Sequence, residues 1–319
     1  MRTPVDPDPR SGHDVVVPRT TVEGTTTAPA SAGASVPTRV LVLGMAHDDG
    51  TIHVDEVLPV ADACGQSPEQ VRSCLRRLVA EGLFTRAGSG REAVFEATEH
   101  GAAELAGGWQ RTRRAYAQDA AGRGWDGRWR LAAFAVPETQ RAARDAFRDR
   151  LLDLGGAAIQ GGLYVSPHPW DDDVRREAVR LGVAAHLTLS STDDLEVRGV
   201  RNGRELAASL WGLDEVAARY EAFTAAHRHV PASLEVRKAS RGRLTDADFL
   251  PLALAMGVAY GRASSIDPHL PPELLPRPWP GRTARDVVVR SRRLALLLRV
   301  DASRPALFSL FDDAVEAVR

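Results

Sequence analysis

Hydrophobic residues recur at helical spacing in three short segments early in the chain. These segments are residues 40–44, 54–64 and 68–82. Two apolar runs at 83–85 and 93–95 follow them and are separated by a glycine-containing turn, which predicts a two-stranded hairpin. Three helices followed by a hairpin are typical of a winged helix-turn-helix domain.

The third of these helices has the clearest start. Ser67 can cap it, Pro68 is tolerated at its first position, and Gln70 can complete a capping box with Ser67. Gly82 ends the helix. The expected apolar face consists of Val71, Leu75, Leu78 and Val79.

The opposite face of this helix predicts contacts with DNA. Arg76 or Arg77 can contact guanine through two hydrogen bonds, and Gln70 can read adenine. Arg91 in the hairpin turn suits a phosphate or the minor groove. A solvated polar helix face would show the same pattern. The DNA-binding candidates are Ser67, Glu69, Gln70, Arg72, Ser73, Arg76, Arg77 and Arg91.

The middle of the chain alternates between strand and helix patterns. In order, these are a strand at 130–136, a helix at 138–154, a strand region at 157–165 broken at Gly161 and Gly162, a helix from 171, and a strand at 186–189. With a hairpin corner within the glycine-rich residues 154–162, this order fits a ferredoxin-like sandwich. Three aspartates open the second of these helices, where the helix dipole favours negative charge.

The predicted fold class is therefore a multidomain α+β protein. A tail at 1–35, rich in Pro, Thr, Ser, Ala and Gly, is expected to be disordered. The winged helix-turn-helix domain and a connecting helix occupy 36–120, and the ferredoxin-like domain occupies 121–198. A helical C-terminal domain occupies 199–319. Its main predicted helices are 213–227, 246–262 and 283–298, with a proline-rich connector at 268–280.

Composition narrows the choice of function. Hydrophobic residues make up 44% and charged residues 26% of the 319 residues, no apolar run is long enough to span a bilayer, and there are two cysteines. We therefore expect a cytoplasmic protein without a membrane partner. The formal net charge is −1, so DNA binding must come from local patches. Lys238 is the sole lysine, which makes arginine patterns less informative in this chain.

Further motifs carry no sign of catalysis. The sequence has no phosphate-cradling glycine loop, nucleophile elbow or zinc-ligand spacing. We therefore expect no enzymatic activity, no cofactor and no bound metal.

Several segments of the chain together match the motifs of one protein family. Residues 125–129 read Trp-Asp-Gly-Arg-Trp, residues 161–167 read Gly-Gly-Leu-Tyr-Val-Ser-Pro, and residues 267–276 begin Asp-Pro-His-Leu-Pro. Further matches are 71–78, 211–213, Tyr220 and 279–281. Over about residues 36–319, the chain resembles the phenylacetate-degradation repressor (PaaX) family. This resemblance implies a homodimeric transcriptional regulator, usually a repressor of aromatic catabolism that is released by an aryl-CoA thioester. The implied partners are an operator in double-stranded DNA, a second copy of the chain and an acyl-CoA effector.

The central domain also resembles Cas2-type nucleases, whose metal chemistry needs an aspartate at the end of the first strand. Here that strand ends in Ala135, Val136 and Pro137, with Glu138 already at a helix start. Two-metal hydrolysis would lack its anchoring carboxylate.

The effector candidates are aromatic residues of the C-terminal region. Trp211, Tyr220, Tyr260 and Trp279 can line an acyl pocket between the second and third domains, where Arg262 or Arg282 would meet the CoA phosphates. Packing between the domains would use the same aromatic residues.

Three functions follow from these patterns. The first is a ligand-responsive DNA-binding repressor. The second is a protein-interaction scaffold that uses the winged helix for dimerisation. The third is a metal-dependent nuclease derived from the Cas2-like domain. Salt-dependent DNA binding separates the first from the second, and metal-dependent cleavage identifies the third.

Overall fold

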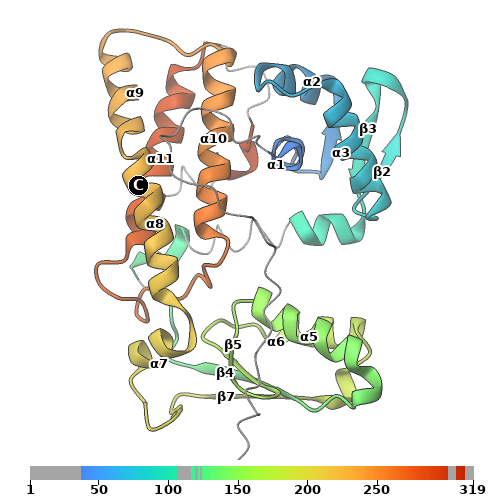
Figure 1. The fold of residues 1–319 in the computed structure, drawn as a ribbon, viewed down its shortest axis with the longest axis vertical. Helices are drawn as coiled ribbons and strands as arrows, with labels where there is room; N and C mark the ends of the chain where they lie inside the picture. The colour runs from blue at the N-terminus through green and yellow to red at the C-terminus, as the bar shows by residue number, and fades with distance from the viewer. Residues whose placement is uncertain (1–36, 106–115, 119–120, 123, 301–306, 313–319) are drawn as a thin grey trace, which may run out of the picture. The chain divides into compact units, whose positions relative to one another are not determined.

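The computed structural model describes residues 37–105, 116–118, 121–122, 124–300 and 307–312 (Figure 1). The predicted tail at 1–35 lies outside the described residues. Within the described part, every helix is too short or too polar to cross a lipid bilayer.

The first part of the chain forms three helices and a small antiparallel sheet. Its elements are α1 (Thr38–Leu43), β1 (Thr51–His53), α2 (Val54–Ala63), α3 (Pro68–Ala80), β2 (Phe84–Ala87), a 3-10 turn (Gly90–Glu92) and β3 (Val94–Ala97). The strand order is β1-β3-β2. The predicted helices and hairpin are confirmed as secondary structure. The sequence analysis missed β1, which has three residues and extends the hairpin by pairing Ile52 with Phe95.

The buried face of α3 differs from the prediction at one position. Val71, Leu75 and Leu78 are buried as expected, but Val79 is 37% exposed and Cys74 is buried in its place. At about 100° per residue, Val79 lies on the edge of the stripe formed by the other residues, whereas Cys74 lies within its arc.

The middle of the chain forms a four-stranded antiparallel sheet covered on one face by α5 and α6 (Figure 1). The elements are β4 (Trp129–Phe134), a 3-10 turn (Glu138–Gln140), α5 (Arg141–Asp153), β5 (Ala157–Gln160), β6 (Leu163–Ser166), α6 (Asp171–Arg180), a 3-10 turn (Ala184–His186) and β7 (Leu187–Thr192). The strand order is β5-β6-β4-β7, as in a ferredoxin-like sandwich. Phe147, Leu151, Trp170 and Val174 fill the space under the helices.

The broken strand region of the prediction is a hairpin made of β5 and β6. Gly162 turns this hairpin with a φ of +75°, and a Cβ there would lie 2.5 Å from the Phe134 carbonyl oxygen. Glycine is therefore required at this position.

The last part of the described chain is helical. Its elements are α7 (Gly203–Leu210), α8 (Leu213–His227), α9 (His229–Ala239), α10 (Asp246–Ser264), α11 (Pro280–Leu298) and a 3-10 turn (Ser309–Phe311). Helix α11 packs against α8 and α9, and α10 packs against α8, α11 and α2 (Figure 1). One apolar core therefore continues from the first three helices into this bundle.

Candidate DNA-binding surface and effector cavities

A reciprocal pair of hydrogen bonds fixes the start of α3. The Gln70 backbone N–H donates to the Ser67 hydroxyl at 3.3 Å, and the Ser67 N–H donates to the Gln70 side-chain oxygen at 2.7 Å. The predicted capping box is thus confirmed. Because the Gln70 oxygen already accepts the Ser67 N–H, the side chain is held against the helix start, which restricts its reach toward adenine.

Glu69 and Arg72 form an ion pair on the exposed first turns of α3, with 3.0 Å between their charged atoms. Hydrogen bonding to its own backbone N–H, followed by contacts with Ser67 and Arg72, lowers the pKa of Glu69 below its ordinary value. Arg72 therefore has a neutralising carboxylate beside it. Ser73 is half-buried on the same helix.

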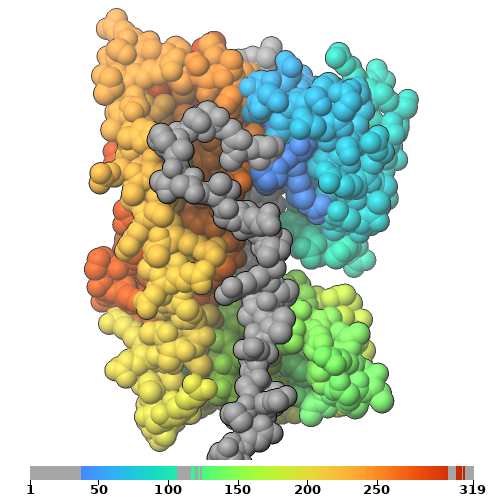
Figure 2. Space-filling model, in the orientation of Figure 1, coloured from blue at the N-terminus to red at the C-terminus, as the bar shows by residue number. Residues whose placement is uncertain are grey.

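The next turn of α3 carries two exposed arginines above a buried apolar face. Arg76 and Arg77 lie on the solvent side, while Leu75 and Leu78 are buried beneath them. Within the described residues, no carboxylate forms an ion pair with either arginine. In the space-filling view, the blue-to-cyan part of the chain that contains α3 and the hairpin is open to solvent (Figure 2).

The hairpin adds two more exposed cations. Gly88 and Gly90 have φ values of +73° and +64°, which give the turn between β2 and β3 its shape. Arg91 is exposed in this turn, and Arg86 is exposed on β2. The sequence analysis missed Arg86. Its position just before a predicted glycine turn is the signal that could have identified it.

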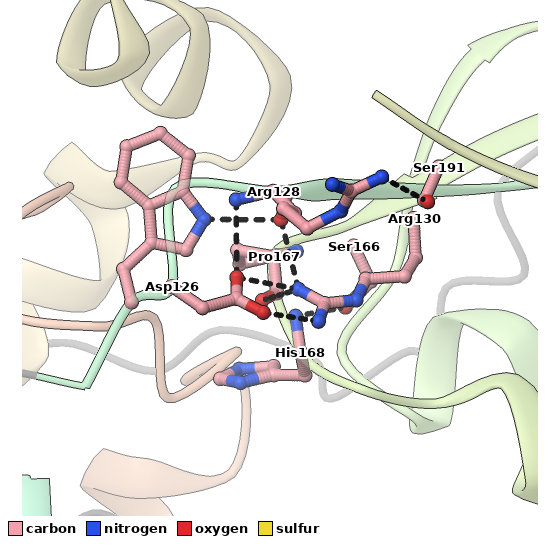
Figure 3. A network of polar contacts seen from close by, with 8 residues as sticks. Asp126, Arg128, Arg130, Ser166, Pro167, His168 and Ser191 are labelled. Carbon is pink, nitrogen blue, oxygen red and sulfur yellow. Dashed lines mark hydrogen bonds and ion pairs between the residues drawn. The ribbon is translucent and has the colours of Figure 1, made fainter. Parts of the chain in front are cut away.

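The Trp-Asp-Gly-Arg-Trp segment performs a structural task in the central domain (Figure 3). The carboxylate of Asp126 accepts hydrogen bonds from the Arg128 N–H at 3.0 Å and from Arg130 Nη1 at 2.7 Å, and its second oxygen pairs with Arg130 Nη2. Arg130 Nη1 also donates to the Pro167 carbonyl at 3.3 Å. The hydrogen bonds with Arg130 hold the pKa of Asp126 below its ordinary value.

Contacts beside the central sheet join it to the helical region. The His168 ring lies 3.3 Å from the Pro268 carbonyl oxygen, and the Trp211 indole N–H donates to the Gly155 carbonyl at 3.1 Å. Trp211 also stacks on Trp129, with ring centroids 6.3 Å apart. These three contacts therefore join the central sheet to the helical region.

Acidic residues of the central domain are engaged with arginines. Glu138 lies 2.6 Å from Arg144, and Asp172 lies 2.9 Å from Arg175. Asp173 pairs with Arg176. In the described part of the chain, no group of three or more His, Cys, Asp or Glu residues could hold a metal ion.

The structure brings three of the five effector candidates together. Tyr220 is fully buried, and its ring lies 6.1 Å from that of Tyr260 and 6.2 Å from that of Trp279. Trp211 belongs to the separate contact with Trp129, and Arg262 is exposed. The five residues therefore do not line one common cavity.

A buried ion pair lies beside this aromatic cluster. The Tyr220 hydroxyl donates to Asp267 Oδ2 at 2.5 Å, and Arg285 Nη1 lies 3.9 Å from the same oxygen. Burial is the main reason that the pKa of Tyr220 is raised. Asp267 opens the Asp-Pro-His-Leu-Pro segment, so this pair fixes that segment against α8 and α11.

Three arginines at seven-residue spacing on α11 and its end are also buried, and the sequence analysis missed them. Arg285 faces Asp267, Arg292 pairs with Asp312 at 2.8 Å, and Arg299 pairs with Asp246 at 3.0 Å. The signal available in the sequence was the seven-residue spacing of these three arginines along a largely apolar helix face.

Three cavities of similar size involve different effector candidates. A cavity of about 420 Å³ lies between the central sheet and the helical region and includes Trp211. One of about 330 Å³ includes Trp279. A strongly apolar cavity of about 360 Å³ includes Tyr260 and is bounded by α1, α10 and α11.

Comparisons with known proteins give two matching family models, one similar named protein and one similar solved structure. The family model for the "PaaX protein central Cas2-like domain" matches residues 122–207, and that for the "PaaX-like protein C-terminal domain" matches residues 211–297. The transcriptional repressor PaaX of Escherichia coli (strain K12) is 25% identical over 260 residues, covering 81% of this chain and 78% of that protein. The uncharacterized protein Rv0674 from Mycobacterium tuberculosis superimposes with a TM-score of 0.44 at 19% identity, covering 88% of this chain and 95% of that chain.

The two family models together match more than half of the chain, and the expected Cas2-like central domain is confirmed. The relative that carries a functional name is a transcriptional repressor. The chain belongs to the PaaX family of transcriptional regulators.

Proposed function

We propose that the protein is a ligand-responsive, DNA-binding transcriptional repressor. In this proposal α1 to β3 form a winged helix-turn-helix, α3 enters the major groove, and the β2–β3 hairpin is the wing. The observation that carries the proposal is the pair Arg76 and Arg77, exposed on a capped helix and without an acidic partner among the described residues.

The chemistry of these side chains suits DNA. An arginine can donate two hydrogen bonds to the O6 and N7 atoms of guanine. Arg86 and Arg91 on the hairpin are placed to approach phosphates or the minor groove, as a wing would. Ser67, Glu69, Gln70, Arg72 and Ser73 complete the proposed DNA-facing set, with Ser67 and Gln70 acting mainly by fixing the helix start.

We further propose that the protein acts as a homodimer on an inverted repeat. One recognition helix covers only a few base pairs, so specific affinity ordinarily requires two half-sites on one face of the duplex. Footprinting is expected to show two protected half-sites separated by about one helical turn. A species that stays monomeric in solution and on DNA would reject the dimer.

The proposed signal is an acyl-CoA thioester that binds outside the winged helix and lowers operator affinity. Among the candidate effector residues Trp211, Tyr220, Tyr260, Arg262 and Trp279, the proposal relies on the cluster of Tyr220, Tyr260 and Trp279. A ligand releases DNA only as far as it prefers the non-binding form, so a hundredfold release needs about 2.7 kcal/mol of coupling.

The test is a titration of the full chain with a fluorescent duplex taken from upstream of its own gene. Specific binding is expected to be tighter than binding to a scrambled duplex, and its affinity should fall as salt rises. Equal affinity for both duplexes at every salt concentration would reject sequence-specific repression. No binding to either duplex would favour the scaffold function.

A further inference from the structure

The apolar cavity next to α1 is lined mainly by side chains from three helices. Helix α1 contributes Leu43, α10 contributes Phe249, Leu252 and Met256, and α11 contributes Val288. Its volume of about 360 Å³ lies in the lower part of the range for small-molecule sites, about 300 to 1,000 Å³. A ring with a few attached atoms fits such a volume, whereas a nucleotide with its phosphates would have to stay outside.

Two polar groups at the border of this cavity have unsatisfied atoms. Among the described residues, Ser291 Oγ and Arg292 Nη1 are buried and have no hydrogen-bond partner. Ser291 is 4% exposed and the Arg292 side chain 10% exposed. The remaining donors of Arg292 hold the Asp312 carboxylate at 2.8 and 3.1 Å. A buried unpaired donor is costly, so both residues favour an incoming oxygen atom.

We propose that this cavity binds a small apolar molecule that carries one carboxylate or carbonyl oxygen. Its apolar body would fill the space between α1, α10 and α11, and its oxygen would accept hydrogen bonds from Ser291 and Arg292. This inference deepens the proposed function, because it names the effector site as this cavity. The same chemistry belongs to a free aromatic acid and to the acyl group of its CoA thioester.

Phe308 connects the cavity directly to α1. It adopts a left-handed conformation with a φ of +65°, which is rare for a bulky residue and tends to occur at functional sites. Its N–H donates to the Gly44 carbonyl at 2.7 Å. Its ring fills the space beside two glycines, since a Cβ on Gly44 or Gly257 would lie 2.6 or 2.5 Å from it.

The position of Phe308 gives the ligand a route to the proposed DNA-binding surface. A molecule in the cavity would press on the Phe308 ring and thereby on the end of α1. Helix α1 packs against α3, which carries Arg76 and Arg77. Occupancy of the cavity would thus act on α1 and, through the packing of α1 against α3, on the position of α3.

The test measures binding by calorimetry on the full chain without DNA, so it does not depend on operator recognition. The probes are phenylacetate, phenylacetyl-CoA and toluene, which has the ring but no oxygen. One of the two oxygen-bearing probes is expected to bind at one site per chain, and to bind at least tenfold more tightly than toluene. Whichever of the two binds identifies the source of the acyl group.

Two variants of one helix locate the site. Ala253 lines the cavity, and Ala255 is exposed on the same helix. Ala253→Phe should abolish binding by filling the space, whereas Ala255→Phe should leave it unchanged. Ser291→Ala should weaken the oxygen-bearing probe about tenfold without affecting toluene. Circular dichroism and melting temperature report whether each variant is folded. If Ala253→Phe does not fold, the affinity of Ser291→Ala for the oxygen-bearing probe tests the site instead.

Several results would overturn the proposal. One is that neither oxygen-bearing probe binds the wild-type chain. Others are that folded Ala253→Phe binds as well as Ala255→Phe does, or that Ser291→Ala leaves the affinity for the oxygen-bearing probe unchanged. If the chain binds a probe in this cavity but binds no operator, the proposed repressor function is rejected and the ligand site stands. If the chain binds its operator but no probe, the ligand site is rejected and the repressor function stands.

Discussion

Arg76 and Arg77 of α3 differ from the arginines of α5 and α6 in what lies beside them. Every arginine of α5 and α6 forms an ion pair with a carboxylate, as Arg175 does with Asp172 at 2.9 Å. Arg76 and Arg77 have no such partner in the part of the chain that the structure describes. In most pairs of the first group, a carboxylate three residues away on the helix neutralises the charge. In the second, the charge faces solvent.

This difference separates two uses of one residue type. The chain carries 41 basic residues, of which Lys238 is the sole lysine, so the abundance of arginine says little about function. Partners say more. An arginine that already holds a carboxylate offers less to a phosphate or a base than one without an acidic neighbour. The comparison therefore favours α3 over the central helices as the DNA-facing surface.

Removing both unpaired arginines of α3 should have the largest effect on DNA binding. Arg76→Ala with Arg77→Ala should lower the specific affinity by about 1 to 3 kcal/mol for each arginine that contacts a base. If either contacts a phosphate instead, affinity should fall for all sequences and the salt slope should decrease by about 1. Anisotropy titrations at several salt concentrations measure both quantities. Wild-type affinity and salt slope in the double variant would contradict the proposed surface.

The buried side of α3 should affect folding instead. Leu75 is 2% exposed and packs in the core below the two arginines. Leu75→Ala should lower the free energy of unfolding by about 2 to 5 kcal/mol, because it leaves a cavity. Thermal and urea denaturation measure this change. Any loss of DNA binding should then disappear at temperatures where the variant is folded, and an unchanged melting temperature would show that the packing of α3 is misjudged.

The helix cap should have an intermediate effect. Ser67→Ala removes the hydroxyl that accepts the Gln70 N–H and should destabilise the fold by about 0.5 to 2 kcal/mol. Ser67→Asp should restore most of the loss, since aspartate also caps helices well. Denaturation of the three proteins measures the difference. A variant with full stability but weak DNA binding would instead make Ser67 a direct DNA contact.

The sequence predicted the start of α3 well because the signal is local. Ser67, Pro68 and Gln70 act within one turn, and the buried face of the helix repeats with its own period. Strand β1 escaped prediction because three residues show no period, and its pairing of Ile52 with Phe95 joins segments far apart in the chain. The strand region predicted at 157–165, broken at Gly161 and Gly162, is a hairpin, but the sequence does not show that its turn at Gly162 meets the Phe134 carbonyl of another strand.

The effector candidates show the limit of sequence reasoning more clearly. Aromatic character identified Tyr260, which lines the apolar cavity, but it equally identified Trp211, which packs against Trp129. Nothing local distinguishes these roles. Phe308 and Arg292 were not singled out, because their importance comes from contacts with α1 and with Asp312. Such tertiary contacts leave no pattern within a short window of sequence.

The stability contributed by the ion pair between Asp126 and Arg130 should depend on pH. Arg130 holds the pKa of Asp126 below its unfolded value of about 3.9. The pair should therefore stabilise the fold above about pH 4 and lose this contribution as the pH falls further. Because the Asp126 side chain is half-exposed, the contribution should be about 1 kcal/mol or less. The melting temperatures of wild type and Asp126→Asn should differ at pH 6 and converge towards pH 3. A difference that grows on acidification would contradict this sign.

Removing two paired arginines from α6 should have the smallest effect of all. Arg175→Ala with Arg180→Ala removes two positive charges, as many as the α3 double variant removes. The acidic partners Asp172 and Glu177 remain. Exposed pairs of this kind contribute about 0.2 to 1 kcal/mol to stability. Operator affinity and its salt dependence should stay at wild-type values, because these arginines are proposed to face no DNA. The two double variants are therefore compared in one titration series. An equal loss of affinity in both would mean that the total charge, rather than the unpaired arginines of α3, governs binding.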